Sequence, residues 1–202
     1  MAQQMSIFSA EVSHPGVADL AGLLCGPGRT AVFARATARL LLPVDDQWRA
    51  NALVKACAER GVAAEVRTCE ESGGPRLSTA FRRDLAPLAS AWTDPAGGKA
   101  VPDCFLPDGA ALRMWVLAAG RWTDGGYLLP LDPTAPHTHA PLAEALLRCG
   151  LPATAPTAKG EVPGLRVVGR RRLARLLELV GPPTGPGCAD QWPAVSRMRA
   201  VS

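Results

Sequence analysis

The chain of 202 residues is long enough to bury a sizeable core, in one large domain or in two small ones. Hydrophobic residues make up 48% of it and charged residues 20%, a balance that excludes an intrinsically disordered chain. The net charge of +4 is too small to identify a nucleic-acid partner by itself, but it permits one if the charge gathers on one face.

The first half of the chain predicts helices alternating with antiparallel strands. Apolar residues recur at helical spacing from Val17 to Leu24, and a run of β-forming residues follows them. The predicted elements are a helix at 17–24, a hairpin at 30–44, a helix at 48–60, strands at 63–69 and 75–80, and a closing helix at 85–92. Gly61 is expected to end the middle helix, because glycine accepts the left-handed backbone that follows a helix.

The second half predicts the same elements in the same order. They are a helix at 112–119, a shorter hairpin segment at 125–131, a helix at 141–149, strands at 152–158 and 165–169, and a closing helix at 173–180. Gly150 takes the position that Gly61 has in the first half. Both halves therefore read αββαββα, and the fold class predicted is α+β.

Three pairs of segments repeat in register. "RLLLPVD" at 39–45 matches "GYLLPLD" at 126–132, "VKACAERGVAA" at 54–64 matches "AEALLRCGLPA" at 143–153, and "RRDLAPLASAW" at 82–92 matches "RRRLARLLELV" at 170–180. Matches in the same order at a nearly constant separation indicate two divergent copies of one unit. We predict repeats at 16–92 and 110–181, a Pro- and Gly-rich linker at 93–109, and a flexible tail at 182–202.

The duplicated order of elements, with "LAGLL" at 20–24 opening the first helix, resembles the LAGLIDADG homing endonucleases. In that family two such units pack through their first helices about a pseudo-twofold axis, and their sheets form a saddle over duplex DNA. The resemblance covers residues 16–181 and implies tandem duplicated αββαββα units in a pseudo-twofold LAGLIDADG-like saddle. The small residues Ala21, Gly22, Ala118 and Ala119 would let the two helices approach closely.

Cleavage in that family needs a carboxylate at the C-terminal end of each signature helix, because the pair holds divalent metal ions at the scissile phosphates. This chain has Cys25 and Pro27 at the end of the first helix and only apolar residues at 117–119. The nearest acid, Asp124, lies beyond Gly120. Because thiols and methyl groups do not bind a hard metal, we expect no metal, no other cofactor and no enzymatic activity.

The branch that the chain resembles most is the WhiA-type sporulation regulators, whose LAGLIDADG-like part lacks the catalytic acids. Those proteins add a helix-turn-helix domain, which we do not expect in the 202 residues of this sequence. The composition, rich in Ala, Arg, Gly and Pro, suits a GC-rich bacterial genome. The resemblance therefore implies a DNA-binding regulator of bacterial development or transcription.

Basic residues on the predicted strands indicate where DNA would bind. Alternate residues of a strand share one face, so cations on one face of the saddle would contact phosphates without regard to sequence. The candidate DNA-binding residues are Arg35, Arg39, Arg67, Arg76, Lys159, Arg166, Arg170 and Arg171. Residues 170–172 are all arginine and open the last helix, where the dipole disfavours each cation by about 0.3–1 kcal/mol. An anionic partner would remove this conflict, and so would pairing with Glu161 or Glu178.

Other interpretations stay open. The arginines also fit a solvated sheet face, and the same fold would serve as a protein-interaction or scaffold module without nucleic acid. That alternative predicts an exposed apolar patch, or acids among the arginines such as Glu65, Glu70 and Glu71. His137 and His139 suggest a metal at first sight, but a loop leading to a helix explains them as well.

Cysteine usage and hydropathy indicate the cellular compartment in which the protein is expected. The six cysteines form no CxxC pair, and the first residues lack the basic start and apolar run of a secretory signal. We therefore expect free thiols, most of them buried. No stretch approaches the roughly 18 unbroken apolar residues of a membrane span, and no motif indicates a small-molecule substrate. These features predict a soluble protein of the bacterial cytoplasm.

Overall fold

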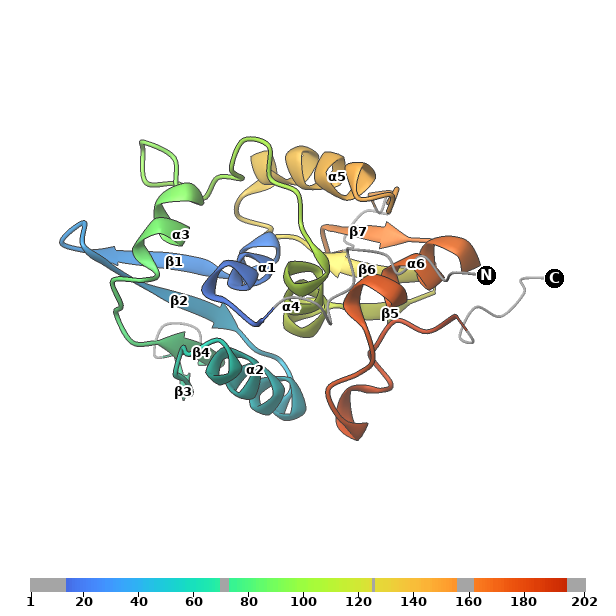
Figure 1. Cartoon of the computed structure of the whole chain (residues 1–202), viewed down its shortest axis with the longest axis horizontal. Helices are drawn as coiled ribbons and strands as arrows, with labels where there is room; N and C mark the ends of the chain where they lie inside the picture. The colour runs from blue at the N-terminus through green and yellow to red at the C-terminus, as the bar shows by residue number, and fades with distance from the viewer. Residues whose placement is uncertain (1–13, 70–72, 125, 156–161, 196–202) are drawn as a thin grey trace.

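Two antiparallel sheets lie on either side of a central pair of helices, α1 and α4 (Figure 1). The structure, a computed structural model, describes residues 14–69, 73–124, 126–155 and 162–195. The strands of the first sheet follow the order β1-β2-β4-β3, and those of the second follow β5-β6-β7. None of the helices within these residues combines the length and the apolar character needed to cross a membrane.

The first half follows the predicted order of elements. A 3-10 turn at Val17–Leu20 leads into α1 (Ala21–Cys25), and then come β1 (Arg29–Phe33), β2 (Thr37–Pro43), α2 (Gln47–Glu59), β3 (Ala64–Thr68), β4 (Pro75–Thr79) and α3 (Ala86–Ala91). Gly61 has φ +71° just beyond α2, which confirms the predicted helix end.

The second half departs from the prediction at one strand. Its elements are α4 (Gly109–Ala119), β5 (Arg121–Thr123), β6 (Gly126–Pro130), a 3-10 turn at Pro136–Thr138, α5 (His139–Arg148), β7 (Gly164–Val167) and α6 (Arg170–Val180). In place of a strand at 152–158, Thr154 forms an isolated bridge with Arg166, and residues 156–161 lie outside the described ranges. Pro152 helps to explain the difference at the described residues, because proline has no N–H to donate to a strand ladder.

The strands of the first sheet alternate between a buried and an open face. Ala38, Leu40 and Leu42 on β2 and Leu77 on β4 are buried in the core. Their neighbours Arg39, Leu41, Arg76 and Ser78 lie on the opposite side and are half-exposed. We call this second side the outer face of the first sheet. It follows from the two-residue period of a strand, as the sequence predicts.

Helices α1 and α4 pack so closely that one position accepts only glycine. A Cβ added to Gly22 would lie 1.9 Å from the carbonyl oxygen of Ala111 and 2.8 Å from the Cβ of Met114. All five residues of α1 and most of α4 are buried. The predicted close approach of these two helices is therefore confirmed at Gly22.

The segments outside the two halves are packed rather than loose. Residues 93–109 contain no named helix or strand before α4, apart from a bridge between Thr93 and Lys99, as expected of a linker. The tail was expected to be flexible, but its described part packs on the second half. Trp192 is buried, and the indole of Trp122 donates to its carbonyl at 3.0 Å. A hydrogen bond between residues 70 positions apart cannot be predicted from the composition of the tail.

All six cysteines are free, as expected. Cys25, Cys57, Cys69 and Cys188 are buried, Cys149 is half-buried, and Cys104 is exposed.

Replacing Gly22 by alanine is expected to lower the free energy of unfolding by about 1–3 kcal/mol, because the new methyl group overlaps the backbone of α4. Urea unfolding followed by circular dichroism measures the change. Gly185→Ala is the matched control, since a Cβ there meets no atom within 4 Å. Equal stability of the two variants would contradict the close helix packing.

Candidate nucleic-acid interface

Three of the predicted arginines meet in one hollow on the outer face of the first sheet. The hollow has a volume of about 360 Å³ and is lined by Arg39, Leu41, Arg67, Thr68, Cys69, Arg76 and Ser78. Arg39 comes from β2, Arg67 from β3 and Arg76 from β4, so three neighbouring strands each contribute one guanidinium. The arrangement concentrates positive charge on a surface that can accept an anion.

Among the described residues, Glu65 pairs with one arginine of this hollow. Arg67 and Arg76 stand directly opposite each other on β3 and β4, a pairing of like charges that destabilises a sheet. Glu65 pairs with Arg67 at 2.8 Å, but both side chains are more than half exposed, so water screens the pair. Glu70 and Glu71 lie outside the described residues. An anionic partner would meet three guanidinium groups on this part of the outer face.

Arg35 lies at the tip of the β1–β2 hairpin and is exposed. It and Ala34 have φ of +55° and +51°, the left-handed region that residues other than glycine rarely adopt. The turn holds Arg35 beyond the edge of the hollow, at the end of the same sheet.

The second sheet presents its own pair of arginines. Arg121 on β5 and Arg166 on β7 both stand opposite Leu128 of β6, so their side chains share a face. Leu128 between them is buried, and Tyr127 and Leu129 point to the opposite side, toward the core. We call the side with Arg121 and Arg166 the outer face of the second sheet. Arg121 was not among the predicted residues, because the turn after the first helix of this half gave no strand signal there. In the sequence, only its position between Gly120 and Trp122, just after the helix, indicates that it begins a hairpin.

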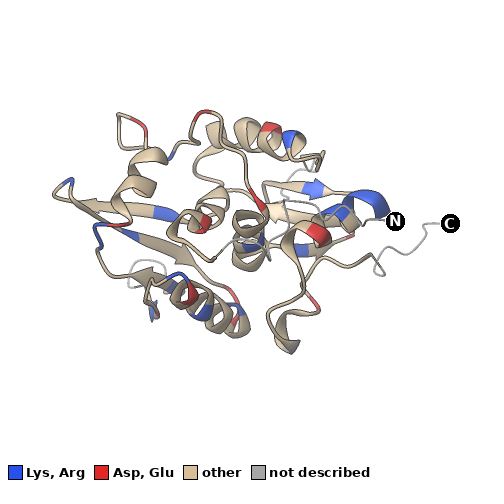
Figure 2. Ribbon diagram, in the orientation of Figure 1, with Lys and Arg blue, Asp and Glu red and all other residues tan. Residues whose placement is uncertain are grey.

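The remaining predicted residues lie near the second sheet. Arg170 and Arg171 open α6 and are exposed, and neither has an ion-pair partner within the described chain. Glu178 pairs instead with Arg175, at 3.0 Å, and Glu161 lies outside the described ranges. Lys159 also lies outside them. Figure 2 shows basic residues on strands of both sheets and at the start of α6.

The C-terminal ends of the two central helices are capped by nearly buried cations. Arg49, on α2, donates to the carbonyl oxygens of Val116, Leu117 and Gly120 at 3.3, 2.5 and 3.0 Å. Lys99, in the linker, donates to the carbonyl oxygens of Gly26 and Gly28 at 2.5 and 2.8 Å, just beyond α1. Cations stabilise this end of a helix, where unpaired carbonyls make the dipole negative. We call Lys99 and Arg49 the capping cations.

Each capping cation forms an ion pair with the aspartate that ends one of the matched segments 39–45 and 126–132. Asp45 lies 3.3 Å from Arg49, and Asp132 lies 3.3 Å from Lys99. Burial lowers the pKa of Lys99, and Asp132 opposes that shift. Burial acts to raise the pKa of Asp132, but hydrogen bonds from Thr134 and the charges of Lys99 and Arg29 bring it below its usual value. Lys99 and Asp132 therefore form an internal ion pair.

The residues at these helix ends do not fit a divalent metal ion. Cys25 donates its thiol hydrogen to the Ala21 carbonyl, and burial raises its pKa well above the usual value. Asp124 lies in the exposed β5–β6 turn, as the sequence predicts. Over the described ranges, no three side chains among His, Cys, Asp and Glu are grouped as metal ligands. The carbonyl oxygens that lie nearby already accept hydrogen bonds from Lys99 and Arg49.

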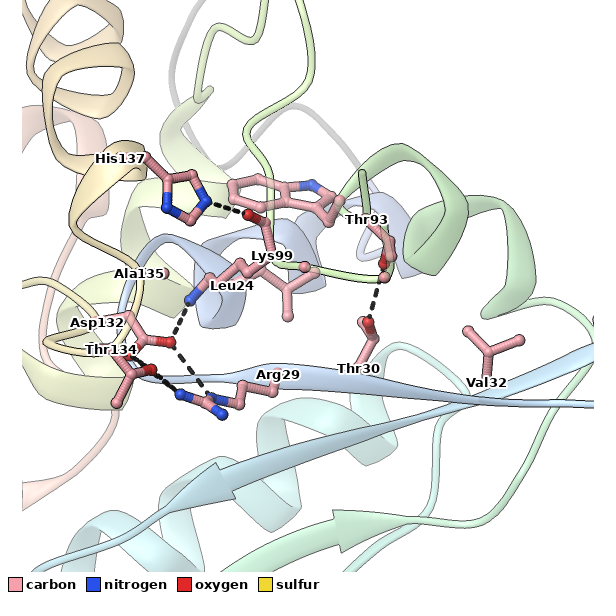
Figure 3. Close-up of a pocket in the computed structure, with 13 residues that line it drawn as sticks. Leu24, Arg29, Thr30, Val32, Thr93, Lys99, Asp132, Thr134, Ala135 and His137 are labelled. Carbon is pink, nitrogen blue, oxygen red and sulfur yellow. Dashed lines mark hydrogen bonds and ion pairs between the residues drawn. The ribbon is translucent and has the colours of Figure 1, made fainter. Parts of the chain in front are cut away.

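A cavity of about 530 Å³ lies where the first sheet, the linker and the second half meet (Figure 3). Its polar groups contact one another. Arg29 reaches both Asp132 and Thr134, and His137 forms a hydrogen bond through Nε2 to the Lys99 carbonyl at 2.6 Å. His139 likewise contacts the Asp132 carbonyl, at 2.8 Å. The two histidines therefore fix the loop to its neighbours.

Comparisons with known proteins identify the fold. No protein-family model matches the chain, and no curated protein matches its sequence. Among solved structures, the homing endonuclease I-WcaI bound to its DNA recognition sequence matches with a TM-score of 0.61 and 13% identity, over 94% of both chains. The N-terminal LAGLIDADG domain of DUF199/WhiA matches with a TM-score of 0.54 and 13% identity, over 86% of this chain and 84% of that one. The chain therefore has the LAGLIDADG fold, as the sequence resemblance implied.

Removing a capping cation is expected to destabilise the protein. Lys99→Met removes the buried cationic partner of Asp132 and the donor to two carbonyls, and we expect a loss of about 3 kcal/mol in the free energy of unfolding. Thermal and urea unfolding measure the loss. Adding Asp132→Leu should recover part of it, because Arg29 is half-exposed and can turn to water.

The control for this pair is Arg67→Met, which breaks an exposed ion pair and should cost less than about 1 kcal/mol. If Lys99→Met and Arg67→Met lowered the free energy of unfolding equally, the ion pair between the linker and the second half would not stabilise the fold.

Proposed function

We propose that this protein is a non-catalytic DNA-binding protein that holds duplex DNA against the outer faces of its sheets. The observation that carries the proposal is the hollow in which Arg39, Arg67 and Arg76 converge from three strands. Arg121 and Arg166 add a second basic site on the other sheet. Contacts from such cations would go chiefly to phosphates and would hold DNA with little dependence on its sequence.

The comparisons support this partner. The homing endonuclease that shares the fold is bound to DNA, and its match extends over nearly the whole of this chain. A fold does not fix function, so the step from that protein to this one rests on the arginines themselves.

The capping cations support the non-catalytic part of the proposal. A divalent metal at the ends of α1 and α4 would need carboxylates, and it would be repelled by the ammonium of Lys99 and the guanidinium of Arg49. The helices themselves end in a thiol and methyl groups, and the nearby carboxylates of Asp45 and Asp132 are paired with the capping cations.

We further propose a regulatory role in bacterial development or transcription, exercised in the cytoplasm. The likeness to the LAGLIDADG domain of WhiA supports that role, since that domain shares the fold over most of both chains. DNA binding without cleavage would suit such a regulator.

A scaffold that binds another protein is the second candidate. Glu65 does lie among the arginines, and Phe33 and Phe81 are exposed, as that alternative predicts. The outer face of the first sheet nevertheless carries more arginines than acids among its described residues, so it fits an anionic partner better. DNA binding measured directly separates the two candidates.

The first test is fluorescence anisotropy of a labelled random duplex across a salt series. We expect a log–log slope that corresponds to several phosphate contacts, at about 0.9 per contact. The double variant Arg39→Ala/Arg76→Ala should reduce the slope by about 1.8. Arg148→Ala, on α5, is the matched control and should leave it unchanged. Failure of the wild-type protein to bind at low salt would overturn the proposal.

The second test is incubation with supercoiled plasmid and Mg²⁺ or Mn²⁺, followed by electrophoresis under denaturing and native conditions. We expect the plasmid to be retarded but to stay supercoiled once the protein is removed, because Asp45 and Asp132 at the described helix ends are paired with Arg49 and Lys99. Nicked or linear product that depends on the metal would contradict the non-catalytic assignment.

A further inference from the structure

Two aromatic side chains are exposed beside the arginine hollow. Phe33, the last residue of β1, has 66% of its surface exposed, and Phe81, just after β4, has 42%. Their ring centroids lie 5.8 Å apart, at an interplanar angle of 53°. We call these residues the aromatic pair. Exposed phenylalanines in contact are uncommon on a surface that has no partner, because each leaves apolar area in water.

The strand register puts Phe33 on the outer face, with the arginines. Phe33 stands opposite Thr37, and Ala31 stands opposite Arg39, so Phe33 and Arg39 point to the same side of the sheet. Val32, also exposed, points to the other side, because its partner is the buried Ala38.

A bulge brings Phe81 to the same place. Leu41 pairs with Ser78 and Ala38 bridges to Arg82, so two residues of β2 face three residues of the other segment. The backbones of Ala38 and Arg82 exchange two hydrogen bonds, of 2.9 and 2.8 Å, which fix the segment. The guanidinium of Arg39 then lies 4.8 Å from the centroid of the Phe81 ring. Phe81 is therefore held in a defined position and not at the end of a loose loop.

The neighbours of the aromatic pair decide what kind of partner fits it. Arg39 touches Phe81, and Arg35 follows Phe33 by two residues in the hairpin turn. A partner that covers both must offer a flat apolar surface within a few ångströms of negative charge. Nucleic acid has this combination, since a base has an apolar face and is attached to a phosphate chain. An acidic protein surface rarely offers a planar apolar group at the same spacing.

We propose that Phe33 and Phe81 form a stacking site for an unstacked nucleobase of the bound DNA, while Arg35 and Arg39 contact the flanking phosphates. The inference rests on the proposed function and goes beyond it, because it assigns a contact that is not electrostatic. The protein would then bind more tightly to a duplex in which one base is already unpaired, since the penalty of unstacking that base is removed.

The test compares a perfect random duplex with the same duplex carrying one single-base bulge, by anisotropy across a salt series. We expect wild-type protein to prefer the bulged duplex by at least about 5-fold, because stacking one base contributes about 1–3 kcal/mol. Phe33→Ala should abolish this preference without changing the salt slope, because no phosphate contact is lost. Arg39→Ala should instead reduce the slope by about 0.9.

Val32→Ala is the matched control, because it shortens an exposed apolar residue of the same hairpin on the opposite face. It should leave both the preference and the slope unchanged. Binding by the wild-type protein with equal affinity for the two duplexes, or a preference that Phe33→Ala retains, would overturn this inference alone. Absence of any DNA binding would overturn the proposed function together with it.

Discussion

The close approach of α1 to α4 is the constraint on which the other features depend. Because Gly22 leaves no room for a Cβ against the backbone of Ala111, the two helices have essentially one way to pack. Each helix leads directly into a hairpin of its own sheet, β1–β2 or β5–β6, so the spacing of the helices also sets the spacing of the sheets (Figure 1). The arginines on the two sheets are thereby held at fixed positions relative to each other. Electrostatic binding to a stiff duplex benefits from such a rigid arrangement.

The capping cations connect the two halves at the C-terminal ends of α1 and α4. Arg49 belongs to the first half and caps α4 of the second, whereas Lys99 joins Asp132 of the second half to the loop after α1. Both cations lie at the negative end of a helix, where a positive charge is stabilised. Charged side chains thus satisfy the C-terminal ends of both central helices and join the two halves, which supports the non-catalytic role proposed above.

Much of the fold could be predicted from the sequence because it depends on local patterns. The helix spacing of 17–24, the alternation in β2 and the glycine after α2 are all read within a few residues. The roles of Arg49 and Lys99 could not be predicted, because their partners lie about seventy residues away in the chain. Arg121 was missed for a related reason, since a three-residue strand is defined by its neighbour β6 and carries almost no pattern of its own. The repeat of the two halves is still a prediction from the matched segments.

The central claim is that DNA lies on the outer faces of the sheets, and arginine side-chain NMR tests it most directly. The guanidinium Nε–H signals of a chain of 21.1 kDa can be followed during titration with a random duplex. The account predicts that the signals of Arg39, Arg67, Arg76, Arg121 and Arg166 shift, while that of Arg148 on α5 does not. Shifts confined to Arg148 and other arginines away from the outer faces, with the sheet arginines unchanged, would contradict it.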